Sequence, residues 1–182
     1  YCVSEPVRKQ VIARFPELAD RTEVLLNFID IKQVQRRSEE PLSDPQYTGE
    51  LKFLTVGRAS EEKGYDIAVQ ITAELKKRGL CFKWFIIGDG RDLNKLRTMA
   101  KEYQVEQEII FLGMRENPAP YVKSCDLYLQ PSRHEGYPIT IVEARSLQKV
   151  IIASDIPSMR EQIRDGENGY LCPLDVMQFA DK

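Results

Sequence analysis

The chain has 182 residues, 26 basic and 28 acidic side chains, a formal net charge of −2 and 42% hydrophobic residues. This length suits one well-packed domain, and the composition is typical of a globular protein. The near-neutral charge argues against a general nucleic-acid binder, and no apolar run approaches the roughly 18 residues that a membrane span needs. The four cysteines form no Cys-x-x-Cys pair. They indicate reduced thiols rather than a zinc site or a disulfide framework.

The first fifty residues show no regular alternation of elements. Residues 5–15 predict a helix, and residues 23–28 predict a short strand. Residues 36–49 (RRSEEPLSDPQYTG) are polar and contain two prolines, which predicts an exposed connector.

From residue 51 onward, short apolar runs alternate with longer stretches that have helical spacing. The predicted strands are 51–57, 82–88, 108–112, 127–130 and 150–154. The predicted helices are 65–78, 93–103, 119–124, 139–147 and 158–163. Nearly continuous apolar strands separated by helices favour an α/β fold, with a Rossmann-like parallel sheet and helices on both faces.

Glycine-containing turns follow four of the predicted strands, at Gly57, Gly88, Gly113 and residues 132–136. In a parallel sheet these turns share the edge formed by the carboxyl ends of the strands. Ligands of such sheets bind at that edge. The pattern therefore predicts one composite site.

The most informative stretch is 131–144 (PSRHEGYPITIVEA), which places Glu135 and Glu143 eight positions apart around a glycine turn. Pro138 suits the first position of the helix that follows. A helix N-terminus after a glycine turn presents unpaired backbone amides, which suit a phosphate group. One glutamate lies before that point and the other about one and a half turns beyond it.

This stretch resembles the Glu-x7-Glu signature of the retaining glycosyltransferases of family 4, whose GT-B architecture consists of two Rossmann-like domains. Four more segments resemble the same family in the same order, namely residues 53–64, 85–90, 110–113 and 160–171. The resemblance implies that residues 1–182 form a single donor-binding domain, the C-terminal half of a GT-B enzyme. The N-terminal acceptor domain of that enzyme would be absent.

The resemblance also assigns roles to individual residues. It implies that Arg58 and Lys63 act on the diphosphate of the donor, that Glu135 lies at the transferred sugar, and that Glu143 accepts hydrogen bonds from the ribose. Further donor-binding residues implied in this way are Gly57, Gly88, Gly90, Gly113, Met114, Arg115, Gly136, Tyr137, Pro138, Ile139 and Thr140. By spacing alone, the two basic residues and Glu143 would be solvent-exposed surface charges.

The stretch 131–144 also contains a histidine and an arginine. His134 is the only histidine, but the family's sugar-facing histidine belongs to the absent domain, so His134 is expected to be a loop residue. Arg133 is a further candidate contact for a phosphate or a sugar.

Leu93 stands at the third glycine position of G-x-G-x-x-G, so the dinucleotide fingerprint fails. The family commonly has Gly and Pro in the segment 147–150 (LQKV), so the helix exit is expected to differ here.

The expected function is donor binding in a retaining, metal-independent glycosyltransferase of polysaccharide biosynthesis. The donor would be a nucleotide-diphosphate sugar, with UDP as the expected nucleotide, and the acceptor a saccharide or a lipid-linked molecule. No Asp-x-Asp pair occurs, and no metal, cofactor or nucleic acid is expected. A non-catalytic sugar-nucleotide-binding module and half of a sugar-nucleotide epimerase are the alternatives. We expect a cytoplasmic protein that is inactive alone and meets the inner face of a membrane only through its absent domain.

Overall fold

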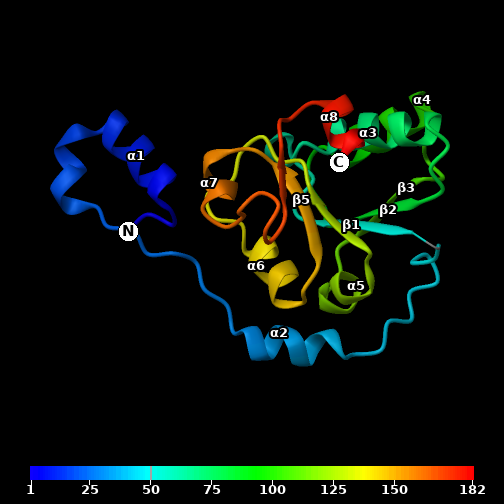
Figure 1. The fold of residues 1–182 in the computed structure, drawn as a ribbon, viewed down its shortest axis with the longest axis horizontal. Coiled ribbons are helices and arrows are strands. Elements are labelled where there is room, and N and C mark those ends of the chain that lie inside the picture. Colours follow the sequence, from blue (N-terminus) through cyan, green and yellow to red (C-terminus); the bar gives the residue numbers. More distant parts are fainter. Residues whose placement is uncertain (50) are drawn as a thin grey trace.

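The computed structural model describes residues 1–49 and 51–182, and its centre is one parallel β-sheet (Figure 1). The strands are β1 (Lys52–Val56), β2 (Lys83–Ile87), β3 (Ile109–Gly113), β4 (Leu127–Gln130), β5 (Val150–Ser154) and β6 (Tyr170–Cys172). They lie in the order β3-β2-β1-β4-β5-β6, and all the neighbouring strands are parallel. The order reverses between β1 and β4, where ligands of open α/β sheets bind. The predicted Rossmann-like α/β fold is confirmed.

Both faces of the sheet are buried because side chains alternate along each strand. Trp84 and Ile86 of β2 point into one core, and Phe85 of the same strand points into the other. The central strands therefore read as continuous apolar runs. Their helices cover the sheet in two layers.

The first core is closed by α3 (Tyr65–Lys77), α4 (Leu93–Glu102) and α8 (Val176–Asp181). The second is closed by α5 (Ala119–Ser124), α6 (Ile139–Ser146) and α7 (Pro157–Arg160). Outside this second layer, α2 (Ile31–Ser38) contacts both α5 and α6. Within residues 1–49 and 51–182, no helix is long and apolar enough to cross a membrane.

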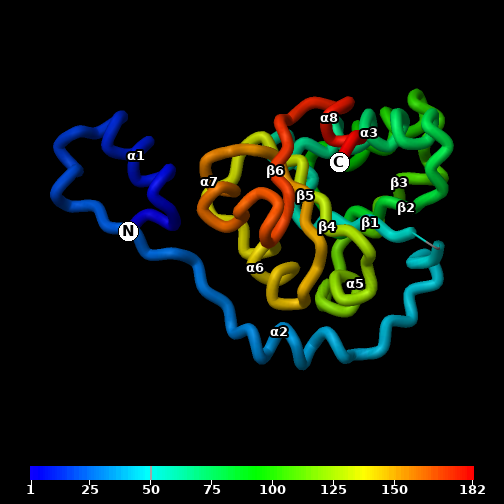
Figure 2. The backbone as a smooth tube through the Cα atoms, viewed as in Figure 1, coloured from blue at the N-terminus to red at the C-terminus, as the bar shows by residue number. Residues whose placement is uncertain are grey.

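The N-terminal segment lies beside the sheet rather than on it. It begins with α1 (Glu5–Arg14), where Ser4 caps the helix by accepting a hydrogen bond from the Val7 amide, and continues with a 3-10 helix at Pro16–Arg21. Figure 2 shows the chain leaving this segment, passing along α2 and rising to β1. The helix α1 contacts α7, and the Glu5 amide donates to the Glu161 carboxylate.

The N-terminal predictions were only partly correct. The helix predicted at 5–15 is confirmed as α1, but the strand predicted at 23–28 is wrong, since only a single bridge joins Val24 to Cys2. The connector predicted at 36–49 begins as the end of α2, a helix that the sequence reasoning missed together with β6. Asp30 starts α2 by accepting a hydrogen bond from the Gln33 amide, an ordinary N-cap.

Two helix ends also differ from expectation. The last predicted helix, 158–163, is shorter and earlier, at Pro157–Arg160. At the exit of α6, Gln148 adopts a φ of 56°, the left-handed region that favours glycine. Here a glutamine carries a backbone conformation that glycine adopts without strain.

Candidate functional site

Five of the predicted site residues, Gly57, Arg58, Lys63, Glu135 and Gly136, meet at the carboxyl edge of the sheet, beside the junction of β1 and β4. A hollow of about 600 Å³ lies there between the loop after β1 and the loop after β4. It is lined by Gly57, Arg58, Ser60, Glu62, Lys63, Arg91, His134, Glu135 and Gly136. The structure thus brings together the three residues predicted to be catalytic, from two motifs that are distant in the sequence.

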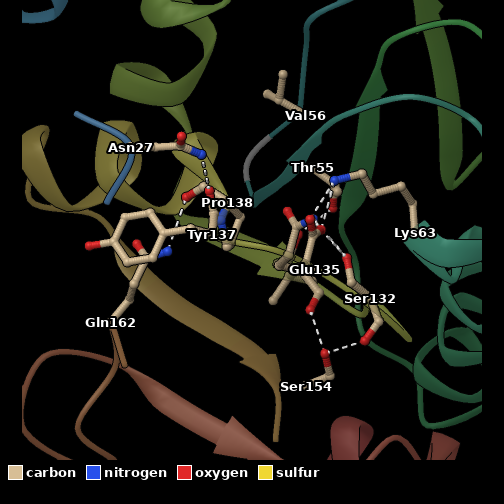
Figure 3. A network of polar contacts seen from close by, with 12 residues as sticks. Asn27, Thr55, Val56, Lys63, Ser132, Glu135, Tyr137, Pro138, Ser154 and Gln162 are labelled. Atoms are coloured by element: carbon tan, nitrogen blue, oxygen red, sulfur yellow. Dashed lines mark hydrogen bonds and ion pairs between the residues drawn. The ribbon is translucent and has the colours of Figure 1, made fainter. Parts of the chain in front are cut away.

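Lys63 and Glu135, which both line the hollow, form an ion pair (Figure 3). Lys63 Nζ is 2.7 Å from Glu135 Oε1 and 2.9 Å from Oε2. The Oε1 atom also accepts hydrogen bonds from Ser132 Oγ at 2.7 Å and Gln130 Nε2 at 3.0 Å. The Glu135 side chain is only 8% exposed, so its position is fixed by four contacts in a nearly buried place.

The loop after β1 and the loop after β4 approach closely because Gly64, the residue at their point of contact, has no side chain. The turn Glu61–Lys63 ends at Gly64, whose φ is +67°. A Cβ atom at this position would lie 1.9 Å from the carbonyl oxygen of Pro131. Only glycine fits both the backbone conformation and the contact, and this closeness puts Lys63 within reach of Glu135.

Buried polar side chains support Glu135 from below. Gln130, Ser132 and Ser154 are fully buried, and the Ser154 hydroxyl donates to the Ser132 carbonyl oxygen. The Tyr128 hydroxyl lies 3.4 Å from Gln130 Oε1 and donates to it. Sequence reasoning missed this layer, because nothing in a serine or a glutamine at a strand end distinguishes a buried hydrogen bond from an exposed one.

Two side-chain amides hold the loop that leads into α6. Asn27 Nδ2 donates to the Tyr137 carbonyl oxygen at 3.0 Å, and Gln162 Nε2 donates to that of Pro138 at 3.3 Å (Figure 3). Pro138 precedes the helix as its cap instead of occupying the first helical position. The first amides of the helix, at Ile139 and Thr140, have no intrahelical acceptor by geometry. Gly136 is packed so closely that an added Cβ would lie 3.1 Å from Val3 Cγ2.

Glu143 lies on the second turn of α6 in a different environment. Burial raises the pKa of its carboxyl, and the positive charge of Arg37 on α2 partly opposes that shift. Across the described ranges 1–49 and 51–182, the Glu143 side chain makes no hydrogen bond. The Thr140 hydroxyl oxygen is likewise buried and lacks a partner in the part of the chain that the structure describes. The ionised Glu143 carboxylate can therefore accept hydrogen bonds from a ligand.

The glycines of the turn after β2 shape the loop that carries Arg58. A Cβ atom on Gly88 would lie 1.9 Å from the Gly57 carbonyl oxygen, and one on Gly90 would lie 2.3 Å from that of Ala59. These two residues therefore support the backbone of the neighbouring loop. Arg58 itself is exposed and lines the hollow.

At the end of β3, Gly113 has a φ of +74° and Met114 is 71% exposed. The guanidinium of Arg115 is engaged by Asp44, with Nη2 at 2.6 Å and Nε at 3.0 Å from Oδ2. It also contacts the Tyr121 hydroxyl. The side chain of Arg115 thus fixes the N-terminal connector to the sheet, and its predicted role in donor binding stays a prediction.

The six-stranded parallel sheet and the helices on its two faces form the Rossmann-like fold found in GT-B glycosyltransferases. The sequence model of the family described as glycosyl transferases group 1 matches residues 37–182, and the chain belongs to this family. Among residues 1–49 and 51–182 there is no group of three or more His, Cys, Asp or Glu side chains placed to hold a metal ion.

Known proteins agree with this assignment. The chain is 29% identical over 179 residues to an uncharacterized glycosyltransferase of Methanocaldococcus jannaschii, covering 96% of this chain and 42% of the relative. It is 31% identical over 174 residues to the lipopolysaccharide 1,6-galactosyltransferase of Salmonella typhimurium, covering 93% and 46%. The chain therefore spans less than half of the length of either relative.

The fold is also similar to a solved structure, Anabaena HepE in complex with UDP and glucose. The TM-score is 0.82 at 20% sequence identity, and the match covers 99% of this chain and 50% of that one. At this identity the likeness concerns the fold alone.

Proposed function

We propose that this chain is the donor-binding half of a retaining, metal-independent glycosyltransferase. It takes a sugar from a nucleotide-diphosphate sugar, with UDP as the nucleotide, for transfer to a saccharide or lipid-linked acceptor. The observation that carries this proposal is the hollow at the β1/β4 junction. It is lined by Arg58, by the Lys63–Glu135 pair and by Gly136, which lies shortly before α6. The UDP and glucose bound by Anabaena HepE, which has a similar fold, support the choice of ligand.

The proposed chemistry follows from where charge develops. When the bond between the sugar and the diphosphate breaks, negative charge grows on the departing phosphate. Arg58 and Lys63 are cations at the hollow, and the N-terminus of α6 adds backbone amides, which together stabilise that charge. These groups would do the work that a metal ion does in other transferases.

Glu135 would contact the transferred sugar without becoming a nucleophile. Its Oε1 atom is engaged by three donors, while Oε2 has Lys63 as its recorded partner in the described residues. A sugar hydroxyl can therefore donate to Oε2, and the carboxylate charge stabilises positive charge on the sugar ring in the transition state. Arg58 and Lys63 act at the leaving group and Glu135 at the sugar.

Glu143 would accept hydrogen bonds from the two ribose hydroxyls. Its half-buried carboxylate offers two acceptor oxygens, and the ligand hydroxyls would supply the donors that the protein does not. The exposed Met114 and the backbone at Gly113 would flank the base at the end of β3.

The remaining parts of the proposal concern the whole enzyme. An N-terminal acceptor-binding half would complete the active site, so this chain alone would bind nucleotide weakly and transfer nothing. Relatives more than twice as long as the match support this division. The enzyme would act in the cytoplasm, reaching the inner face of a membrane through its acceptor-binding half.

The test is calorimetric titration of the protein with UDP and, separately, with GDP. We expect UDP to bind more tightly and Glu143→Ala to weaken it. As a matched control, Glu102→Ala replaces an exposed glutamate at the end of α4 and should leave the affinity unchanged. Equal binding of both nucleotides, or undiminished binding by Glu143→Ala, would contradict the assignment of base or of ribose contact.

A further inference from the structure

The loop after β4 and the start of α3 are joined by a bidentate ion pair outside the hollow. Arg133 Nη1 is 2.6 Å from Asp66 Oδ1, and Nη2 is 2.6 Å from Oδ2. The Nη1 atom also donates to the Glu61 carbonyl oxygen at 3.0 Å. The guanidinium therefore binds both the side chain and the backbone of the segment that follows β1. We call the side-chain pair the Arg133–Asp66 clamp.

The backbones of the two segments are connected beside this clamp. The amides of Arg133 and His134 both donate to the Glu62 carbonyl oxygen, at 2.8 Å and 3.2 Å. Two residues after Glu62, Gly64 allows the close approach to the Pro131 carbonyl oxygen. Residues 61–66 and 131–134 are thus joined at several points.

The position of the clamp matters because of its neighbours in the sequence. Lys63 lies within the first segment, and Glu135 lies two residues after Arg133. Both residues face the hollow, whereas the clamp lies on the outer side, with the side chains of Arg133 and Asp66 35% and 33% exposed. Any shift between the segments would change the distance between Lys63 and Glu135.

We propose that Arg133 and Asp66 are positioning residues that fix the relative placement of the two loops carrying Lys63 and Glu135. This inference rests on the proposed function, because those loops are the ones that hold the diphosphate and the sugar. Arg133 is then not the phosphate or sugar contact that its place in the motif suggests. Its guanidinium is already bound on two sides by Asp66 and the Glu61 carbonyl.

The two roles make opposite predictions for Asp66→Ala. If Arg133 positions the loops through Asp66, removing either partner has the same effect, and removing both adds nothing. If Arg133 contacts the ligand, Asp66→Ala frees the guanidinium, so UDP binds at least as well as before. The lowered pKa of Asp66, caused mainly by its hydrogen bond from Arg133, agrees with an ion pair that is formed at neutral pH.

The first measurement is UDP titration of the protein and of Arg133→Ala, Asp66→Ala and the double variant. Each single variant should bind about five-fold more weakly, the effect expected for one well-formed bidentate pair at a partly exposed place, and the double variant no more weakly than either. The exchanged pair, Arg133→Asp with Asp66→Arg, should recover part of the affinity. Wild-type affinity in Asp66→Ala together with weak binding by Arg133→Ala would overturn the proposal.

The matched control uses Arg78, at the other end of α3. Its guanidinium binds Glu74 at 2.7 Å and Asp181 at 2.6 Å, so it ties α3 to α8 as Arg133 ties α3 to the loop. Arg78→Ala should leave UDP affinity unchanged. An equal loss in this variant would show that any weakening of α3 suffices, which would also overturn the proposal.

A second measurement needs no ligand. Hydrogen exchange of the Arg133 and His134 amides should be faster in Asp66→Ala than in the wild type or in Arg78→Ala, because the clamp keeps both amides on the Glu62 carbonyl. Unchanged exchange would overturn the positioning role of the Arg133–Asp66 clamp, whatever the UDP titration shows. If exchange changes but the wild type binds no UDP, the clamp stands and the proposed donor is wrong.

Discussion

The two glutamates of the Glu-x7-Glu stretch have the same chemistry and opposite surroundings. Glu135 is nearly buried and accepts hydrogen bonds from Lys63, Gln130 and Ser132. Glu143 is half-buried, its pKa is raised by burial, and no side-chain hydrogen bond of its own is found in the described residues. The protein has thus satisfied the first carboxylate and left the second one without a partner.

This difference separates two kinds of site residue. The surroundings of Glu135 fix its place before any ligand arrives, so its contribution is pre-organised geometry. Glu143 carries a cost of desolvation that the charge of Arg37 offsets only in part, and a ligand that donates hydrogen bonds would reduce it further. Variants of the two regions should therefore affect stability and binding in different proportions.

The largest expected effect tests how closely the region around Glu135 is packed. Gly64→Ala should lower the free energy of unfolding by about 3 kcal/mol or more, because the new Cβ would meet the Pro131 carbonyl oxygen and the positive φ would be strained. Gly79→Ala is the control, with a φ of +81° and no atom within 4 Å of the added Cβ. It should cost only about 1 kcal/mol. Equal costs in urea unfolding would contradict the close loop contact.

A somewhat smaller effect tests how far Lys63 compensates the nearly buried charge of Glu135. Lys63→Met removes the cation from a carboxylate that is 8% exposed, and should cost about 2–4 kcal/mol in unfolding free energy. Adding Glu135→Gln removes the uncompensated charge and should restore about half of that loss. Lys101→Met, at an exposed position of α4, is the control. A double variant as unstable as Lys63→Met alone would show that the ion pair is not what stabilises this loop.

For Glu143 we expect a clear effect on UDP binding and little effect on stability, the reverse of what we expect around Glu135. Glu143→Gln should weaken UDP binding about ten-fold, since hydrogen bonds to a charged acceptor contribute roughly 1.5–3 kcal/mol and a neutral amide keeps part of that. The variant should be no less stable than the wild type at neutral pH. Calorimetry and urea unfolding on the same samples give both numbers. A clear loss of stability would contradict the view that this carboxylate lacks a partner.

The smallest effect is the pH dependence that follows from the raised pKa of Glu143. A carboxyl whose pKa is higher in the folded state contributes stability below its unfolded pKa and loses that contribution as the pH rises through the folded value. The stability advantage of Glu143→Gln over the wild type should therefore grow as the pH rises from the unfolded pKa of Glu143 to its folded pKa, and should be complete above the folded value. UDP affinity should fall further in the wild type than in the variant between about pH 8 and about pH 5, because only the ionised form accepts both ribose hydroxyls. Parallel curves would exclude Glu143 as the titrating group.

The sequence alone predicted the strands whose burial on both faces leaves a continuous apolar run. It missed the elements whose structure depends on contacts with distant residues. The strand β6 is only three residues long and begins with the exposed Tyr170, so no apolar run marks it. In α2 the residues are mostly charged or amides, and the capping residue Asp30 was the signal that could have found it.

The site shows the same limit. Lys63 and Glu135 are 72 positions apart; the strand pattern placed their loops at one edge of the sheet, and the resemblance to a family assigned the two side chains to one site. Asn27 and Gln162, which hold the loop before α6, follow no pattern that spacing or composition could reveal. Their roles depend on which carbonyl oxygens the fold brings within reach.

The strand order has a consequence for how the molecule is made. In the centre of the sheet β1 neighbours β4, and the Thr55 hydroxyl of one donates to the Leu129 carbonyl of the other across 74 positions of sequence. During synthesis, the strands β1 to β3 are made and emerge from the ribosome before β4. The hollow is completed only when β4 and the loop after it join β1. A nucleotide bound there, as we propose, would therefore stabilise the joined sheet and would not assist the first half to form.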